Sequence, residues 1–200
     1  MQAIKAYTQI YNDFDGQKIL EKIEKVARTC YKSEGKIQEG SAAKMVASLI
    51  KSGHEAMIEH VSVTVKFVVD RGISHELVRH RLASFAQEST RYCNYSKDKF
   101  GNELTFIEPY WWDSCIDDRL EFLQSCEMAE KMYLKMIKRG ITPQFARDVL
   151  PLATKTELVM TGFVDDWKNF FSQRLADNAH PQARELATNL KELFKINKLL

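Results

Sequence analysis

The run of nine residues from Val61 to Val69 fits one kind of secondary structure, a β-strand with one buried face. Valine or phenylalanine stands at each odd position of this run, and Ser62, Thr64 and Lys66 stand at three of the even positions. Because successive side chains of a strand point to opposite faces, this period of two predicts a half-buried strand. Any fold for this chain therefore includes a sheet.

Helical periodicity and turn residues predict the elements around that strand. Apolar residues recur at helical spacing over 16–31, and a second helix is expected to begin at Ser41, as its N-cap, and to end at Gly53. A third helix is expected over 74–82 with Ser74 as its N-cap. A long helix is expected over 114–139, with a Ser114/Asp117 capping box at its start and Gly140 at its end. Three more are expected from Thr142 to Pro151, over 165–176 and over 181–198.

Strands are also expected over 3–8 and 154–164, whereas 84–90 has the composition of a polar loop. Strands and helices do not alternate as repeated βαβ units, so the predicted class is α+β, a β-sheet with packed helices. Since no repeat, low-complexity tract or linker divides the chain, we expect one domain over residues 1–200.

Composition argues against several classes of protein. Apolar runs such as 67–69 are far shorter than the ~20 residues that a bilayer requires. None of the eight glycines has the spacing of a dinucleotide-binding or phosphate-binding loop, so side chains would have to hold any nucleotide. A net charge of +2 is too small for a general nucleic-acid coat. The four cysteines lack C-x-x-C spacing, which favours reduced thiols and a cytoplasmic location.

The segment from Arg71 to Tyr92 concentrates the polar chemistry. It holds four arginines, two histidines and four Ser or Thr hydroxyls. Ser89, Thr90 and Arg91 together offer hydroxyls, backbone N–H groups and a guanidinium, which suit a phosphate monoester. From the residues alone, a solvated arginine face and a module that binds RNA or DNA through Arg71–Arg91 both remain open.

Metal and thiol chemistry have weaker support. His75 and His80 stand five residues apart, about 140° around a helix, so they are poorly placed to share a zinc ion, and no metal site is predicted. Cys93 lies near the basic segment but has only Arg91 to lower its pKa, so we expect a buried thiol there rather than a nucleophile.

Four sequence elements resemble the flavin-dependent thymidylate synthase family. They are the RHR-x7-S pattern of Arg79–Arg81 and Ser89 extended to Tyr92, the G-H-E…E-H pattern of 53–60, the A-R-x-x-L-P pattern of 146–151, and an arginine helix over 170–186. Their order along the chain also matches, which makes the resemblance far more specific than any one motif would be.

The resemblance implies an enzyme that methylates dUMP to dTMP in a homotetramer whose active sites lie between subunits. It implies FAD as a tightly bound cofactor, methylenetetrahydrofolate as carbon donor and NADPH as reductant, with neither nucleic acid nor membrane as partner. The family's cofactor contacts correspond to His54, Arg79, His80, Arg81, Gln87 and Asn169. Its substrate contacts correspond to Glu76, Arg79, Gln87, Ser89, Thr90, Arg91, Arg147 and Arg174.

Arg174 is the catalytic candidate within this resemblance. A guanidinium with a pKa above about 12 cannot act as a base, but it can stabilise negative charge that develops on the N3/O4 edge of uracil. The reduced flavin would supply the hydride.

Several positions depart from the family pattern. Glu76 and Gln87 exchange an acid and an amide relative to several members, and Thr90 replaces a frequent glycine. An N-x-R stretch is missing at 163–165, so its flavin contacts are not carried over.

A third alternative is a non-enzymatic helical assembly protein. In such a protein the five arginines 79, 81, 91, 147 and 174 would share no ligand.

Overall fold

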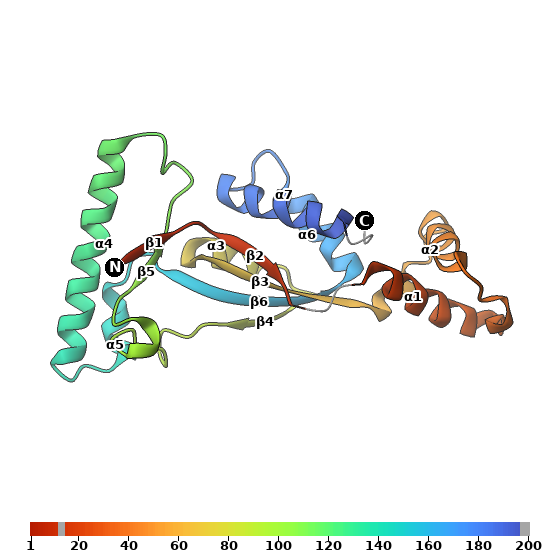
Figure 1. The fold of residues 1–200 in the computed structure, drawn as a ribbon, viewed down its shortest axis with the longest axis horizontal. Coiled ribbons are helices and arrows are strands. Elements are labelled where there is room, and N and C mark those ends of the chain that lie inside the picture. The colour runs from red at the N-terminus through yellow and green to blue at the C-terminus, as the bar shows by residue number, and fades with distance from the viewer. Residues whose placement is uncertain (12–14, 197–200) are drawn as a thin grey trace. The chain divides into compact units, whose positions relative to one another are not determined.

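The computed structural model describes residues 1–11 and 15–196, and these form helices together with two small sheets (Figure 1). The helices are α1 (Gly16–Tyr31), α2 (Ser41–Lys51), α3 (Arg71–Leu77), α4 (Ile116–Lys138), α5 (Pro143–Ala146), α6 (Val164–Arg174) and α7 (Pro181–Ile196). Short 3-10 helices are η1 (Glu34–Lys36), η2 (Glu55–His60), η3 (Asp98–Phe100) and η4 (Arg147–Val149). The strands are β1 (Gln2–Ile4), β2 (Tyr7–Ile10), β3 (Ser62–Asp70), β4 (Ser84–Gln87), β5 (Thr105–Ile107) and β6 (Lys155–Phe163). The predicted α+β class is confirmed.

The larger sheet has the strand order β2-β3-β6-β4, and the smaller one pairs β1 with β5 in parallel. The strands predicted over 61–69 and 154–164 are β3 and β6, the two central strands. Val63, Val65 and Phe67 are fully buried on β3, as are Leu158 and Met160 on β6. The alternation in the sequence therefore identified the buried face of the sheet correctly.

The chain divides into two compact units. The first contains residues 1–8, 66–79 and 85–159, and the second contains 9–65, 80–84 and the chain from 160 onward. In the first unit, Tyr133 of α4 is fully buried in a cluster with Tyr95, Leu104 and Phe106. The expectation of one domain over residues 1–200 stays a prediction.

The core of the second unit is aromatic. Trp167 of α6 is fully buried, and its ring centroid lies 5.3 Å from that of Phe170 and 5.4 Å from that of Phe194 on α7. Its indole Nε1 donates a hydrogen bond to the carbonyl of Val63 at 3.3 Å. This bond satisfies the single polar atom of the side chain, which burial would otherwise make costly.

A buried carboxylate joins α1 to α2. Glu24 is only 1% exposed and accepts hydrogen bonds from Nε and Nη2 of Arg28 at 2.8 and 2.6 Å, and from Oγ of Ser41 at 2.9 Å. The expectation that Ser41 is an N-cap is therefore wrong by one residue, because Gly40 is the cap and Ser41 begins the helix. The predicted end is confirmed, since Gly53 has a φ of 67° and His54 N donates to the carbonyl of Leu49 at 2.9 Å.

Two further predicted caps are wrong. Asp70 caps α3 by accepting a bond from Ile73 N at 2.8 Å, whereas Ser74 is buried inside the helix, which ends at Leu77 rather than Leu82. At α4 the cap position is Cys115, and no side chain caps it. The end of α4 is confirmed at Gly140, whose φ is 89°.

The remaining predictions are confirmed with changes. The predicted strand over 3–8 is interrupted after Ile4 and becomes β1 and β2. The predicted loop over 84–90 is wrong in its first half, which forms the edge strand β4. Pro143 begins α5, and the predicted helices over 165–176 and 181–198 are α6 and α7, although residues 197–198 lie outside the described residues. None of the helices in the described ranges has the length and apolarity needed to cross a membrane.

Candidate functional site

In the first unit, a tight turn follows the edge strand β4 and presents three of the predicted substrate residues. The N–H groups of Tyr92 and Cys93 donate to the carbonyl of Ser89 at 3.1 and 2.8 Å, and Arg91 N donates to Oγ of Ser89 at 3.3 Å. Arg91 is exposed, with its guanidinium carbon 5.5 Å from the centre of the Tyr92 ring. The turn therefore leaves a cation in solvent beside a half-buried hydroxyl.

Thr90 lies inward from this turn and meets Arg147. The Thr90 side chain is 4% exposed, and its Oγ1 accepts a hydrogen bond from Nη1 of Arg147 at 3.2 Å. Arg147 follows α5 directly, where the A-R-x-x-L-P segment changes from helix to a 3-10 turn. Two motifs that are 57 residues apart in sequence thus contact each other.

Gln87 belongs to a hydrogen-bonded group in the same unit. Its Nε2 donates to Oγ of Ser74 at 2.9 Å and to Oγ1 of Thr156 at 3.2 Å. Ser74 donates in turn to the carbonyl of Arg71 at 2.8 Å, and Nη1 of Arg71 donates to Thr156 at 3.4 Å. The amide of Gln87 therefore uses its donor atoms on the protein, so its carbonyl is the part suited to a ligand.

Glu88 is the residue before the turn, and its carboxylate binds Tyr95 and Lys155. Its Oε1 accepts from the hydroxyl of Tyr95 at 2.9 Å and its Oε2 from Nζ of Lys155 at 3.0 Å. Burial opposes the charge of Lys155, but its hydrogen bonds to Glu157 and Glu88 outweigh that effect and raise its pKa. Cys93 is half-buried rather than buried as predicted. Burial and then the charge of Glu88 raise the pKa of its thiol, so this thiol is not activated. The four residues Glu88, Tyr95, Lys155 and Glu157 also line a cleft of about 340 Å³.

In the second unit, His80 and Arg174 form a direct side-chain pair. Nε of Arg174 donates to Nε2 of His80 at 3.0 Å, and the imidazole packs on Phe170 with ring centroids 5.0 Å apart. Burial and then the charge of Arg174 lower the pKa of His80 to about 4. The imidazole is therefore neutral near pH 7, and because Nε2 accepts a hydrogen bond, its proton sits on Nδ1.

The Nδ1 atom of His80 is buried and makes no hydrogen bond to any described residue. A buried N–H without an acceptor is uncommon in folded proteins and is a reason to look for a missing ligand. Among the described residues of the second unit, this atom and Nε of Arg184 are the buried side-chain polar atoms that lack a hydrogen-bond partner.

The other predicted residues lie at the surface. His54 is exposed at the start of η2, and Asn169 is exposed on α6, where its Oδ1 accepts from Nε2 of Gln173 at 3.1 Å. Arg79 and Arg81 are exposed on either side of His80 in the sequence, and neither forms an ion pair with a described residue. Glu76 is half-buried on α3.

The structure thus groups the predicted residues in two sets. Glu76, Arg79, Gln87, Ser89, Thr90, Arg91 and Arg147 belong to the first unit, and His54, His80, Arg81, Asn169 and Arg174 belong to the second. Sequence reasoning missed Glu88, Tyr95 and Lys155. A signal was available for Lys155 and Glu157, since these two charges alternate with buried residues along the central strand β6.

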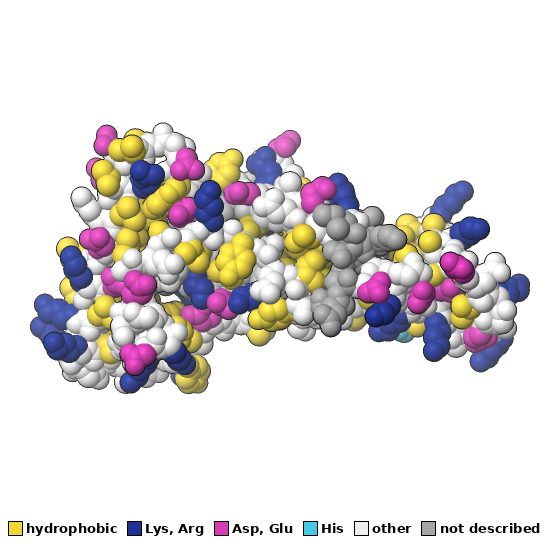
Figure 2. Space-filling model, in the orientation of Figure 1, with side chains coloured by type: hydrophobic (Ala, Val, Ile, Leu, Met, Phe, Trp, Pro, Cys, Tyr) yellow, Lys and Arg dark blue, Asp and Glu magenta, His cyan; other side chains and the backbone are white. Residues whose placement is uncertain are grey.

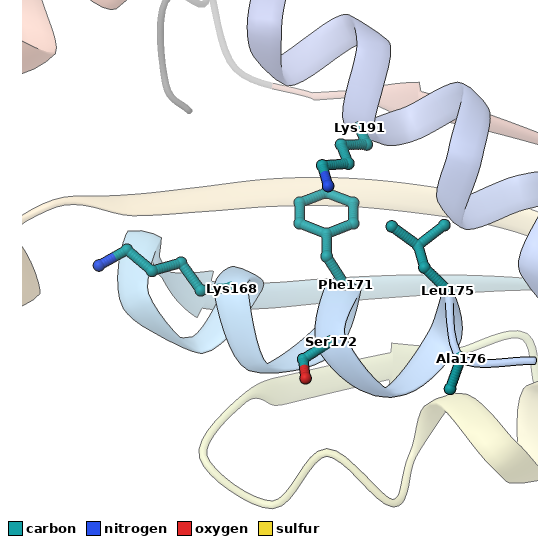
Figure 3. A pocket seen from close by; sticks show the side chains of 6 residues that line it. All are labelled: Lys168, Phe171, Ser172, Leu175, Ala176 and Lys191. Carbon is teal, nitrogen blue, oxygen red and sulfur yellow. The ribbon is translucent and has the colours of Figure 1, made fainter.

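A groove between α6 and α7 lies apart from the predicted residues. It has a volume of about 460 Å³ and is lined by Lys168, Phe171, Ser172, Leu175, Ala176 and Lys191. Figure 3 shows the Phe171 ring and the Leu175 side chain extending toward α7, while Lys168 points away from it. Lys168 forms an ion pair with Asp165 at 2.8 Å.

Comparison with known proteins gives a consistent result. The family model described as thymidylate synthase complementing protein matches residues 16–196. A flavin-dependent thymidylate synthase of Pyrococcus abyssi is 35% identical over 170 residues, which are 82% of this chain and 67% of the relative. That of Pyrococcus furiosus is 34% identical over 162 residues, 78% of this chain and 64% of the relative. The matched part therefore spans about two thirds of the length of these relatives.

A solved structure has the same fold. A UMP/dUMP methylase of Streptomyces cacaoi, crystallised with 5-Br dUMP, superposes with a TM-score of 0.75 at 21% sequence identity. The superposition covers 100% of this chain and 96% of that one. At this level of identity the likeness concerns the fold.

Proposed function

The chain belongs to the flavin-dependent thymidylate synthase family, and we propose that it methylates dUMP to dTMP with a bound flavin. The observation that carries the proposal is the family match over 16–196, which includes every candidate site residue. The contact between Thr90 and Arg147 supports it, because two of the motifs behind the resemblance meet there.

The residues fit FAD as the cofactor. A diphosphate group requires cationic or N–H donors, and Arg79 and Arg81 are exposed arginines without an ion pair to a described residue. His80 adds a buried N–H that lacks an acceptor. Arg79, His80 and Arg81 would hold the cofactor together with His54, Gln87 and Asn169. When bound, FAD supplies the hydride that reduces a transferred methylene to a methyl group.

The turn at 89–91 is the proposed site for the phosphate of dUMP. Ser89 and Arg91 present donors at the surface, and the Thr90 hydroxyl holds Arg147 in place. Charge-assisted hydrogen bonds contribute roughly 1.5–3 kcal/mol each, while micromolar affinity corresponds to about 8 kcal/mol. Two or three such bonds would therefore provide a large part of the affinity for dUMP. Glu76 and Gln87 complete the proposed set of substrate contacts.

Arg174 is proposed to stabilise negative charge on the uracil ring. The neutral imidazole of His80 accepts a hydrogen bond from the Nε–H of the Arg174 guanidinium. A protonated His80 could not accept that bond and would repel the guanidinium. The low pKa of His80 therefore keeps Arg174 oriented near neutral pH, which is the preorganisation that this kind of catalysis requires.

The further partners belong to the same proposal. Methylenetetrahydrofolate would donate the carbon, NADPH would reduce the cofactor, and the working form would be a homotetramer in the cytoplasm.

The test of the reaction starts from the purified protein incubated with FAD, dUMP, methylenetetrahydrofolate and NADPH. We expect a visible flavin absorption band and the formation of dTMP, measured by chromatography. Omitting dUMP, methylenetetrahydrofolate or NADPH should abolish the product. A protein that takes up no FAD, or that forms no dTMP when all four are present, would contradict the proposal.

The role of Arg174 is tested by Arg174→Ala, with Arg139→Ala at the exposed end of α4 as the matched control. We expect Arg174→Ala to lose at least about a hundredfold in turnover, as removal of one oxyanion donor does, while it still binds FAD. Arg139→Ala should retain activity. Full turnover of Arg174→Ala would remove the proposed role.

A further inference from the structure

The turn after β4 is joined to the sheet by three side chains that the proposed reaction does not use. Glu88 stands immediately before the turn and Tyr95 follows it, and the hydroxyl of Tyr95 donates a hydrogen bond to Oε1 of Glu88 at 2.9 Å. The other carboxylate oxygen, Oε2, accepts from Nζ of Lys155 on the neighbouring strand β6 at 3.0 Å. One carboxylate therefore connects both ends of the turn with the sheet. We refer to Glu88, Tyr95 and Lys155 as the Glu88 cluster.

The Glu88 cluster is largely shielded from water. Tyr95 is 6% exposed, and the side chains of Glu88 and Lys155 are 11% and 20% exposed. Burial and then the charge of Glu88 raise the pKa of Tyr95 above its usual range, so the phenol keeps its proton and is the donor. Hydrogen bonds to a charged group are stronger than neutral ones, and a low local dielectric strengthens them further. These bonds therefore hold the cluster in one geometry.

Each member of the Glu88 cluster is also held by another part of the first unit. The Tyr95 ring lies 5.8 Å from that of Tyr133 on α4, whose hydroxyl accepts from Tyr95 N at 3.4 Å. Lys155 also donates to Oε1 of Glu157 at 2.9 Å, and Glu88 N donates to the carbonyl of Glu157 at 2.8 Å. The cluster is thus a rigid support that belongs entirely to the first unit.

The turn that this support holds carries the donors proposed for the phosphate of dUMP, at Ser89 and Arg91. The carbonyl of Ser89 accepts from the N–H groups of Tyr92 and Cys93 at 3.1 and 2.8 Å. Bonds of this kind close a turn, but bonds within a turn cannot orient it relative to the rest of the unit. The carboxylate of Glu88 provides such a link to the sheet.

The surface charge makes the placement of individual donors important. Figure 2 shows acidic and basic side chains interspersed over one face of the molecule. On such a mixed surface, the position of the nearest donors decides how tightly a phosphate binds, rather than the field of an extended basic surface. Ordering a mobile segment during binding costs conformational entropy, whereas a segment that is ordered beforehand avoids this cost.

We propose that Glu88, Tyr95 and Lys155 are positioning residues that order the 89–91 turn before dUMP binds. They act through the turn and make no contact with the substrate. This inference rests on the proposed function, because it takes residues 89–91 as the site for the phosphate of dUMP. The order of the turn itself requires no ligand, so it can be measured separately.

The first test measures the order of the turn in the full chain without dUMP. Tyr95→Phe removes one hydroxyl and keeps the ring. We expect the amides of Tyr92 and Cys93 to exchange their hydrogens about tenfold faster in this variant, measured by mass spectrometry, because the turn opens more often. Cys126→Ala is the matched control, since it removes a buried side chain of the same hydrophobic cluster as Tyr95. It should leave the exchange of the turn unchanged.

The second test compares two ligands of the flavin-loaded protein, dUMP and deoxyuridine, which lacks the phosphate. Tyr95→Phe should bind dUMP about tenfold more weakly in calorimetry, while its affinity for deoxyuridine and its FAD content stay unchanged. In steady-state assays the KM for dUMP should rise and kcat should not change, because the lost interaction is the same in the ground state and the transition state. A general weakening of the core would reduce the affinity for both ligands.

Substitutions at Glu88 and Arg91 test the route of the effect. Glu88→Gln keeps an oxygen that can accept from Tyr95, so it should retain more affinity for dUMP than Glu88→Ala, which leaves Tyr95 and Lys155 without this partner. In a protein that already carries Arg91→Ala, Tyr95→Phe should weaken dUMP binding much less than it does alone. Such non-additivity shows that the two residues act on the same contact.

The outcomes distinguish this inference from the proposed function. An unchanged affinity of Tyr95→Phe for dUMP, or equal losses of affinity for dUMP and deoxyuridine, would overturn the positioning role. Unchanged exchange of the turn amides would overturn it as well. If Tyr95→Phe exchanges faster but the unmodified protein binds no dUMP, the cluster orders the turn as proposed and the proposed function fails.

Discussion

The low pKa of His80 predicts a specific dependence of stability on pH. His80 is 6% exposed, accepts a hydrogen bond from Arg174 and has a pKa of about 4, against 6.5 for an ordinary histidine. Between these two values the unfolded chain takes up a proton that the folded chain does not bind. The free energy of unfolding therefore falls as the pH decreases from 6.5 toward 4, and the contribution is fully present above that range.

The size of the effect follows from the two pKa values. A difference of one in pKa corresponds to a free-energy difference of about 1.4 kcal/mol. Between about pH 8 and about pH 5, the titration of His80 alone should lower the free energy of unfolding by about 2 kcal/mol. This is a substantial part of the 5–15 kcal/mol that typically stabilises a domain.

The comparison with His80→Gln isolates this contribution. Glutamine can accept the Nε–H of Arg174 through its carbonyl oxygen, but it does not titrate. The free energy of unfolding of each protein is measured with urea at about pH 8 and about pH 5, which gives one pH-dependent loss for each protein. Groups that titrate in both proteins contribute equally to both losses, so they cancel when the two losses are compared. We expect the unmodified protein to lose about 2 kcal/mol more than the variant. Equal losses would show that His80 is not held neutral in the folded protein.

Three further substitutions test other contacts. Glu24→Ala leaves the half-buried Arg28 without its partner, so it should lower the free energy of unfolding by about 3–5 kcal/mol in urea titrations. A loss below about 1 kcal/mol would contradict this prediction. Gly140→Ala places a Cβ on a residue whose backbone φ is 89°. It should lower the free energy of unfolding by about 1–2 kcal/mol, which a lower Tm would show. Thr90→Val removes the hydroxyl that holds Arg147 and should raise the KM for dUMP at least about tenfold, with unchanged FAD content, in steady-state assays.

The periodic parts of the fold could be predicted from the sequence. The predicted and observed bounds of α1 agree, β3 was found from its alternation, and β6 was found from its mixture of β-branched and apolar residues. The N-caps could not be predicted. Ser41 and Ser74 both have the right chemistry, but residues distant in sequence engage them, since Ser41 donates to Glu24 and Ser74 accepts from Gln87. A hydroxyl that is held by a distant partner does not cap the nearest helix.

The candidate site was predictable only where a motif carries it. The resemblance to a family indicated Thr90 and Arg147, and the structure shows that they are in contact. The ion pair between Glu88 and Lys155 was missed because it depends on the register between β4 and β6. A short edge strand with weak alternation, such as 84–87, does not reveal that register.

The lone proton on Nδ1 of His80 has a consequence for affinity. An unmet buried donor costs the folded chain about 1–3 kcal/mol, and the cost disappears once an oxygen or nitrogen of a ligand accepts that proton. A compound that reaches this atom would therefore bind roughly fivefold to a hundredfold more tightly than an isostere lacking the acceptor. The imidazole of His80 would thus discriminate between two molecules of the same shape.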